Sequence, residues 1–243
     1  MNLKTTDCFT PVSTASEPNT SVGRSRGLLS FLRRPDEFMP RDNSWPALLR
    51  TACWFFGQLF VFGVGMAVLI TLDLSPASGS EGSGSATQQV PILLMVLLPP
   101  LVEELLFRFP LRRKRWILSV WAVCVAWFGM SMMLGVKVHA GEYLVWRLLA
   151  AAALGAAVWF RGWRWLQRIG YGWYFYILAL LFGAGHIFNY IAEDHVTAGQ
   201  IAFWVLYTAD KTAAGLIYGY ARIKHGFWAC VVLHVLNNLP FVI

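Results

Sequence analysis

Charged side chains are scarce in this sequence. Asp, Glu, Lys and Arg make up only 14% of its 243 residues, whereas 57% of the residues are hydrophobic. Together with a positive mean hydropathy, this scarcity of charge excludes an ordinary soluble domain and indicates a protein with several membrane spans.

Cysteine is also rare. The four cysteines are Cys8, Cys53, Cys124 and Cys230, and three of them lie inside apolar runs. Because the chain has no CxxC pair and no alternating Cys/His spacing, we predict neither a disulfide framework nor a thiolate metal site.

The chain also lacks the features of a secreted or nucleic-acid-binding protein. The first apolar run starts far from Met1 and has no small-residue cleavage site, so no signal peptide is predicted. The net charge of +7 is not accompanied by a basic patch interleaved with aromatic residues, and we expect no nucleic-acid partner. In a membrane protein, an excess of basic residues marks the cytoplasmic loops instead.

Seven apolar runs separated by polar or basic segments predict an all-α, polytopic transmembrane bundle. Residues 1–44 are expected to form a disordered cytoplasmic tail, in which 28–32 either lie on the membrane surface or belong to a plain linker. Residues 45–243 are expected to form the membrane domain, with a Ser/Gly-rich linker at 73–89 and an acidic loop at 193–195. The predicted spans are 45–72, 90–111, 116–136, 143–160, 173–192, 198–221 and 226–243.

Basic residues alternate along these spans. Seven Lys or Arg lie between Met1 and Arg50, four follow the second span, three follow the fourth and two follow the sixth, whereas the opposite loops contain only Lys137. The positive-inside rule therefore predicts a cytoplasmic N-terminus. The lipid bilayer is an expected partner of the spans.

Two adjacent carboxylates lie inside the second predicted span, in the segment 101–108. Glu104 and Arg108 are four residues apart and share one helical face, where they can pair. Glu103 is rotated by about 100° from Glu104 and pairs with no charge in its own helix. Charges within a span are costly and by default indicate function.

Further polar groups lie at a similar depth in other spans. Counted at about 1.5 Å per residue, they fall in one layer between the cytoplasmic side and the middle of the bilayer. Arg147, by contrast, is placed near the outer side, where we expect its side chain to reach the interface. The groups of the layer are Glu103, His186, Asp210, Lys211 and His234.

Such a layer supports hydrolysis by an activated water. A carboxylate and an imidazole can hold and deprotonate a water, and His234 with Asn238, one helical turn apart, can donate hydrogen bonds to an oxyanion. Glu103, His186 and His234 could instead bind zinc, although there is no HExxH motif. The same groups are also compatible with simple interhelical hydrogen bonds, with a non-catalytic scaffold, or with an ion-coupled transporter that uses Glu103, Asp210 and Lys211.

Three motifs in this order resemble the CPBP family of intramembrane proteases, which includes the type II CAAX prenyl endopeptidases and bacteriocin-processing proteins. The family signature is EExxxR, then FxxxH, then HxxxN or HxxxD, and the resemblance covers about residues 90–243. It is carried by Glu103-Glu104 with Arg108, Phe182 with His186, and His234 with Asn238.

The resemblance implies a glutamate-dependent endopeptidase with an all-helical membrane fold, and we expect that it requires no cofactor. Glu103 would be the general base and would act with His186 on water, His234 and Asn238 would form the oxyanion hole, and Glu104 and Arg108 would support the site. The substrate would be a membrane protein or peptide, and the expected location is the bacterial cytoplasmic (inner) membrane. The sequence leaves the oligomeric state open.

Overall fold

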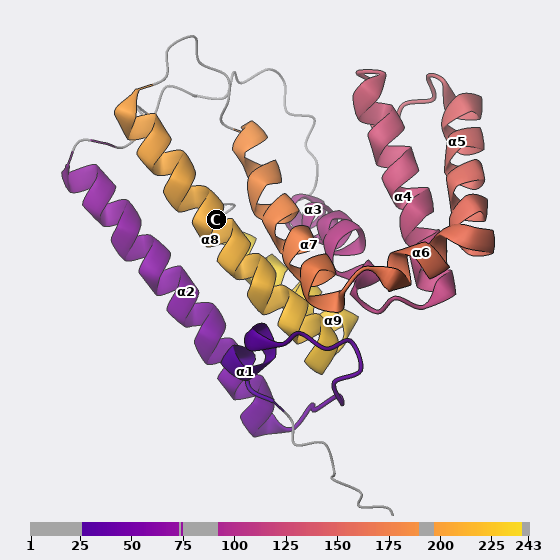
Figure 1. Cartoon of the computed structure of the whole chain (residues 1–243). Helices are drawn as coiled ribbons and strands as arrows, with labels where there is room; N and C mark the ends of the chain where they lie inside the picture. The colour runs from indigo at the N-terminus through magenta and orange to yellow at the C-terminus, as the bar shows by residue number, and fades with distance from the viewer. Residues whose placement is uncertain (1–25, 73, 75–91, 190–196, 240–243) are drawn as a thin grey trace, which may run out of the picture.

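A computed structural model describes residues 26–72, 74, 92–189 and 197–239, and all regular structure within these ranges is helical (Figure 1). The all-α fold is therefore confirmed. The helices are α1 (Leu28–Arg33), α2 (Trp45–Thr71), α3 (Ile92–Phe107), α4 (Arg115–Met133), α5 (Leu144–Ala157), α6 (Trp163–Arg168), α7 (Tyr171–Gly185), α8 (Ala198–Lys224) and α9 (Phe227–Asn238), with short 3-10 helices at Phe109–Leu111 and His186–Asn189 and a π-helical segment at Val158–Gly162.

Three helices of the described chain are long and apolar enough to cross a membrane: α2, α4 and the continuous helix Leu144–Arg168. Two further apolar helices, α7 and α9, are shorter. Helix α8 has the length of a span, but Asp210, Lys211, Arg222 and Lys224 lie within it. The structure is thus a helical membrane bundle, while the predicted count of seven spans and their orientation stay predictions.

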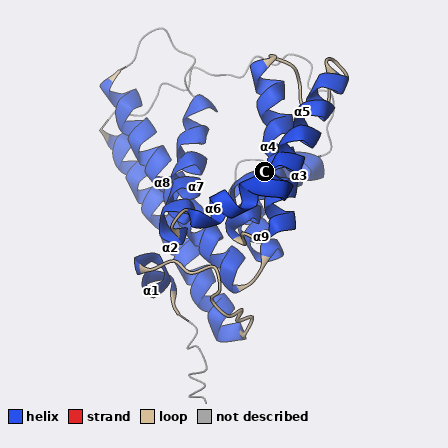
Figure 2. Ribbon diagram, turned by 45° about the vertical axis from the view of Figure 1, so that its right-hand side comes forward, coloured by secondary structure: helices blue, strands red, loops and turns tan. Residues whose placement is uncertain are grey.

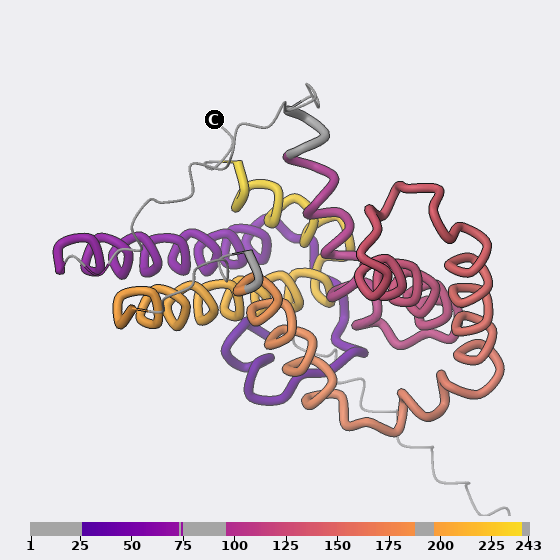
Figure 3. The backbone as a smooth tube through the Cα atoms, turned by 90° about the horizontal axis from the view of Figure 1, so that it is seen from above, coloured from indigo at the N-terminus to yellow at the C-terminus, as the bar shows by residue number. Residues whose placement is uncertain are grey.

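The helices form two regions. In the first, which we call the core bundle, α8 packs against α2, α7 and α9, and α3 packs against α7 and α9; Figure 3 shows α2 and α8 running side by side. The second region is the α4–α5 hairpin, whose two helices pack on each other and stand apart from α2 and α8 (Figure 2). Contacts of α4 with α3 and with residues 109–111 join the hairpin to the core bundle.

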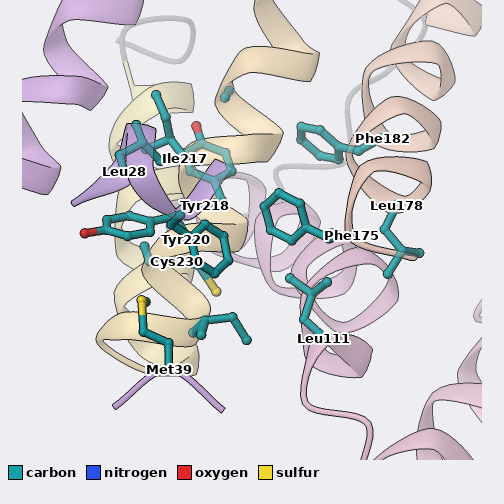
Figure 4. Close-up of a cluster of buried hydrophobic side chains, with 14 of the residues drawn as sticks. Leu28, Met39, Leu111, Phe175, Leu178, Phe182, Ile217, Tyr218, Tyr220 and Cys230 are labelled. Carbon is teal, nitrogen blue, oxygen red and sulfur yellow. The ribbon is translucent and has the colours of Figure 1, made fainter. Parts of the chain in front are cut away.

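Aromatic side chains fill the centre of the core bundle (Figure 4). Phe175 and Phe182 from α7 meet Tyr218 and Tyr220 from α8, and Leu111, in the 3-10 helix that follows α3, also belongs to the cluster. Within a bilayer, close packing rather than removal from water drives helix association, so the contacts among these rings hold α7 and α8 together.

Helix α1 belongs to the folded structure. Phe31 is fully buried and packs edge-on against Phe175 and at a tilt against Tyr220, and the Tyr220 hydroxyl donates a hydrogen bond of 3.0 Å to the carbonyl of Arg26. The expected disorder of residues 1–44 therefore does not hold for 26–44, because Leu28 and Phe31 lie three residues apart and form one apolar face. Residues 1–25 lie outside the described ranges.

The fourth predicted span continues further than expected. The sequence predicts that this span ends at residue 160 and that a basic loop follows, but the helix runs to Arg168. The basic residues of the predicted loop lie on the exposed side of this helix: Arg161, Arg164 and Arg168. The helix persists because Trp163 and Leu166 on its other side pack near Leu118, Ala122 and Val158. The predicted linker 73–89, apart from Leu74, and the acidic loop 193–195 lie outside the described residues, as do 90–91, 190–192 and 240–243.

Arg147 is buried rather than directed to the interface. Its guanidinium donates to the carbonyls of Ala140 (2.7 Å) and Val138 (2.5 Å) and lies 4.0 Å from the centre of the Trp127 ring. The expectation of an interfacial side chain was wrong because the loop before α5 folds back and supplies two acceptors, which helix geometry alone does not reveal.

Local signals set the ends of α8. Thr197 and Gln200 form a reciprocal capping box at its start, which satisfies backbone donors that a helix leaves open. At its end Gly226 adopts a φ of +114°, a conformation that favours glycine. This turn reverses the chain so that α9 packs back against α8 and carries His234 into the core bundle.

Candidate active site

The site is built around the end of α3. Glu104 is fully buried, and its Oε1 lies 3.5 Å from a guanidinium nitrogen of Arg108, one helical turn later. The guanidinium carbon of Arg108 lies 3.7 Å from the centre of the Phe182 ring. A buried carboxylate is tolerated when a cation and hydrogen bonds compensate its charge, so Arg108 allows Glu104 to be buried.

Helix α9 supplies the second partner of Glu104. Nδ1 of His234 lies 2.9 Å from Oε1 of Glu104, and an ionised carboxylate only accepts hydrogen bonds, so Nδ1 carries the donated proton. The imidazole also stacks on the ring of Tyr218, with 5.1 Å between ring centres. His234 is therefore fixed on one edge by a charge and on one face by an aromatic ring.

Glu103 has a different environment from its neighbour. Its side chain is 30% exposed, against 0% for Glu104. Oε2 of Glu103 lies 3.6 Å from Nε2 of His186 and 3.6 Å from Nε2 of His234. These separations are longer than direct hydrogen bonds, and among the described residues this buried oxygen has no hydrogen-bond partner.

His186 is oriented by its own helix. Its Nδ1 lies 2.7 Å from the carbonyl oxygen of Phe182, one turn earlier at the end of α7. A carbonyl can only accept, so Nδ1 carries the proton and Nε2 of the neutral ring is left as an acceptor. That acceptor is the nitrogen that faces Glu103.

The structure thus brings five of the six predicted site residues together through direct contacts: Glu103, Glu104, Arg108, His186 and His234. Asn238 is half-buried and accepts a hydrogen bond of 3.2 Å from the side chain of Asn237. In the part of the chain that is described, it has no hydrogen bond to the glutamates or histidines of the site.

Two further predicted groups, Asp210 and Lys211, lie on α8 beside the site, since Tyr207 one turn earlier on α8 packs 6.2 Å from the His186 ring. Asp210 accepts a hydrogen bond from Gln58 on α2 and lies 3.5 Å from Lys211, and the Lys211 ammonium lies 5.1 Å from the centre of the Tyr207 ring. Asp210 faces an apolar cavity between α2 and α8. Over the described ranges, no three His, Cys, Asp or Glu side chains have the arrangement of a metal site, and zinc binding at Glu103, His186 and His234 stays a hypothesis.

Tyr218 was not anticipated from the sequence. Besides stacking on His234, its ring centre lies 5.3 Å from the guanidinium carbon of Arg108. The sequence carries a signal in Gly215 and Gly219, a pair of small residues four apart that flanks Tyr218 and is typical of close helix packing. A Cβ at Gly215 would lie 3.0 Å from Arg108 and 3.3 Å from Phe182. The small residues bring α8 close enough for Tyr218 to reach the site.

Comparison with protein families matches residues 86–240 to the family described as "Type II CAAX prenyl endopeptidase Rce1-like". The chain belongs to this family. As an Rce1-like protein it is an integral membrane protein of the CAAX-protease type, and membership implies protease activity in general. No match was found among curated proteins, and none among solved structures.

Proposed function

We propose that this protein is an intramembrane endopeptidase that hydrolyses a peptide bond with water activated by Glu103 and His186. The observation that carries the proposal is the convergence of both imidazole Nε2 atoms on Oε2 of Glu103, each at 3.6 Å. A carboxylate and an acceptor nitrogen in this arrangement can hold one water between them and draw a proton from it.

In the proposed reaction the water oxygen attacks the scissile carbonyl while its proton passes to Glu103. The tetrahedral intermediate collapses when the C–N bond breaks, and Glu103 returns the proton to the leaving nitrogen. His234 and Asn238 would donate hydrogen bonds to the oxyanion. Because Nδ1 of His234 already donates to Glu104, His234 has to carry a second proton on Nε2 for this role.

Glu104 and Arg108 are proposed to act as positioning residues. Glu104 fixes the imidazole of His234 through its hydrogen bond of 2.9 Å, and Arg108 compensates the buried charge of Glu104 from 3.5 Å. A loss of either group would release His234 from its orientation rather than remove a reacting atom.

The proposed substrate is a membrane-associated protein or peptide cleaved near the cytoplasmic face. In support, basic segments gather at one end of the bundle: Arg112 donates to the carbonyl of Ile223 and Arg113 to that of Ile169. The positive-inside rule assigns such an end to the cytoplasm. We further propose the bacterial cytoplasmic membrane as the location.

The test compares the termini of membrane proteins by mass spectrometry in cells that carry the wild type, a deletion, Glu103→Gln or the control Glu142→Gln. Glu142 is an exposed carboxylate in the loop before α5. We expect the same altered termini in the deletion and in Glu103→Gln, and a wild-type pattern for Glu142→Gln. Accumulation of each variant is checked by immunoblot.

A scaffold or a transporter predicts different results. A scaffold on the same fold would be insensitive to Glu103→Gln, so a wild-type pattern in that variant overturns the proposal. A transporter that relays ions through Glu103, Asp210 and Lys211 would depend on an ion gradient. Cleavage of an identified substrate by purified protein in detergent, where no gradient exists, would rule out the transporter.

A further inference from the structure

A cavity of about 590 Å³ lies where several helices end, between the segment before α2, the end of α8 and the starts of α4 and α9. Four of its lining side chains are basic: Arg41, Arg112, Lys114 and Arg222. No acidic side chain is among the described residues that line it. The walls of the cavity therefore concentrate positive charge.

The guanidinium groups of half-buried Arg112 and buried Arg222 are held by carbonyl oxygens rather than by carboxylates. Arg112 donates to the carbonyls of Ile223 (2.9 Å) and Met39 (3.4 Å), and its Nε is buried without a hydrogen-bond partner in the described structure. Arg222 donates from Nε to the carbonyl of Arg108 at 3.2 Å. Carbonyl oxygens fix a guanidinium in place but leave its charge available to an anion.

The neighbouring Arg113, by contrast, has a carboxylate that compensates its charge. Its guanidinium forms an ion pair of 2.8 Å with Glu37 and also donates to the carbonyl of Ile169 at 2.7 Å. Glu37 is thus committed to Arg113, which does not line the cavity. Of these two neighbouring arginines, Arg113 has a carboxylate partner, whereas Arg112, which lines the cavity, is held by carbonyl oxygens.

Burial lowers the pKa of Arg112, and repulsion from Arg41 lowers it further, while Tyr171, Glu37 and Asp36 act in the opposite direction. Repulsion between cations that share a cavity is relieved by an anion placed between them. The electrostatics of the cavity therefore favour an anionic ligand.

The position of the cavity indicates the kind of anion. Helix α2 begins at Trp45, α4 begins at Arg115, α8 ends at Lys224 and α9 begins at Phe227, so the cavity lies level with the ends of the bundle. Its remaining walls include aromatic rings, among them Phe109 and Trp116. Basic groups beside aromatic rings at the end of a membrane bundle suit a headgroup that stays attached to acyl chains.

We propose that this cavity binds the phosphate headgroup of an anionic phospholipid. The basic side chains would contact the phosphate, and the aromatic rings would contact the glycerol and the first carbons of the chains. This binding does not depend on the proposed peptidase reaction, and it would anchor the junction of the core bundle with the α4–α5 hairpin.

The test uses the purified full chain in lipid-depleted detergent, titrated with dioleoylphosphatidylglycerol, with dioleoylphosphatidylcholine, or with inorganic phosphate. Native mass spectrometry counts the lipids bound. The pocket variant is Arg41→Gln with Lys114→Gln, two exposed side chains whose loss should spare the fold. The control, Arg161→Gln with Arg168→Gln, removes the same charge from exposed positions outside the cavity.

We expect phosphatidylglycerol to bind the wild type and the control alike, and the pocket variant to lose about tenfold or more, since each cation near an anionic surface contributes roughly a factor of five. Equal binding of phosphatidylcholine, unchanged binding by the pocket variant, or an equal loss in the control would overturn the proposal. Displacement of the lipid by millimolar inorganic phosphate would assign the site to a soluble phosphate and overturn the lipid assignment.

Discussion

Arg108 in the core bundle and Arg147 in the α4–α5 hairpin are both buried, and both lie over an aromatic ring, yet their polar partners differ. Arg108 faces the carboxylate of Glu104, which in turn holds His234. Arg147 faces two backbone carbonyls of the loop before α5. The first arginine is part of a charge network that reaches the candidate active site, whereas the second ties a loop to a helix.

The contrast separates two uses of a costly buried charge. In the core bundle, the cation compensates a carboxylate and thereby fixes an imidazole, so its removal should change both folding and chemistry. In the hairpin, the buried cation donates to two carbonyls of a partly exposed loop and touches no residue of the site, so its removal should affect folding alone.

The largest effect is expected for Arg108→Ala. It leaves the Glu104 carboxylate buried without its cation, which typically costs about 3–5 kcal/mol. Accumulation in the membrane and the thermal unfolding midpoint should both fall, and cleavage per folded molecule should fall with them. Arg108→Lys keeps the charge and should recover part of both; full activity in Arg108→Ala would show that Glu104 needs no cation.

Next is Gly183→Ala, at the contact of α7 with α8. The added Cβ would overlap the Thr212 hydroxyl and lie 2.9 Å from the Thr208 carbonyl, and such overpacking costs about 1–3 kcal/mol. The matched change in the hairpin is Gly129→Ala, which meets nothing within 4 Å and should stabilise α4 by about 0.5–1 kcal/mol. Thermal unfolding of the two variants should shift in opposite directions.

Arg147→Ala should have a smaller and purely structural effect. It leaves the carbonyls of Val138 and Ala140 without their donor, at a cost of about 1–3 kcal/mol, lessened wherever water reaches the loop. Unfolding in detergent should begin at a lower temperature, while cleavage per folded molecule stays at the wild-type level. A loss of activity as deep as that of Arg108→Ala would mean that the hairpin is coupled to the site.

The smallest effect concerns pH. Burial lowers the pKa of His225, between α8 and α9, where its Nε2 lies 2.8 Å from the Thr51 hydroxyl. The unfolded imidazole has a pKa of about 6.5, so the folded state prefers the neutral ring. Its contribution is complete above that pH and is lost as the pH falls through the lower, folded-state value.

The unfolding midpoint should therefore decrease between pH 7.5 and pH 5, and His225→Gln should remove part of that decrease. The matched control is His139→Gln, at an exposed histidine of the hairpin loop, which should leave the pH profile unchanged. Identical profiles for the wild type and His225→Gln would contradict the assignment.

Much of the site could be predicted because it depends on helix periodicity and depth. The spacing of Glu104 and Arg108 fixes their shared face, and counting residues from the span ends places Glu103, His186 and His234 in one layer. The structure shows the pair at 3.5 Å and both imidazoles at 3.6 Å from one oxygen of Glu103.

Other features could not be predicted, because they depend on contacts with residues that are distant in the sequence or lie in loops. The burial of Arg147 required carbonyls from a loop, and the position of Tyr218 required the close approach of α8 at Gly215. Asn238 shares a helical face with His234, but the structure pairs it with Asn237. Periodicity gives the side of a helix on which a residue lies, but it does not give the side chain that meets it there.

Helix α1 has a consequence for biosynthesis. The hydrogen bond from Tyr220 to the carbonyl of Arg26 joins residues 194 positions apart. Residues 26–33 are synthesised before any span, but the surface that receives Phe31 exists only after α7 and α8 have been synthesised and packed. The first helix of the chain is therefore among the last to dock, and a nascent chain arrested before α8 would present the apolar face of α1 to chaperones and proteases.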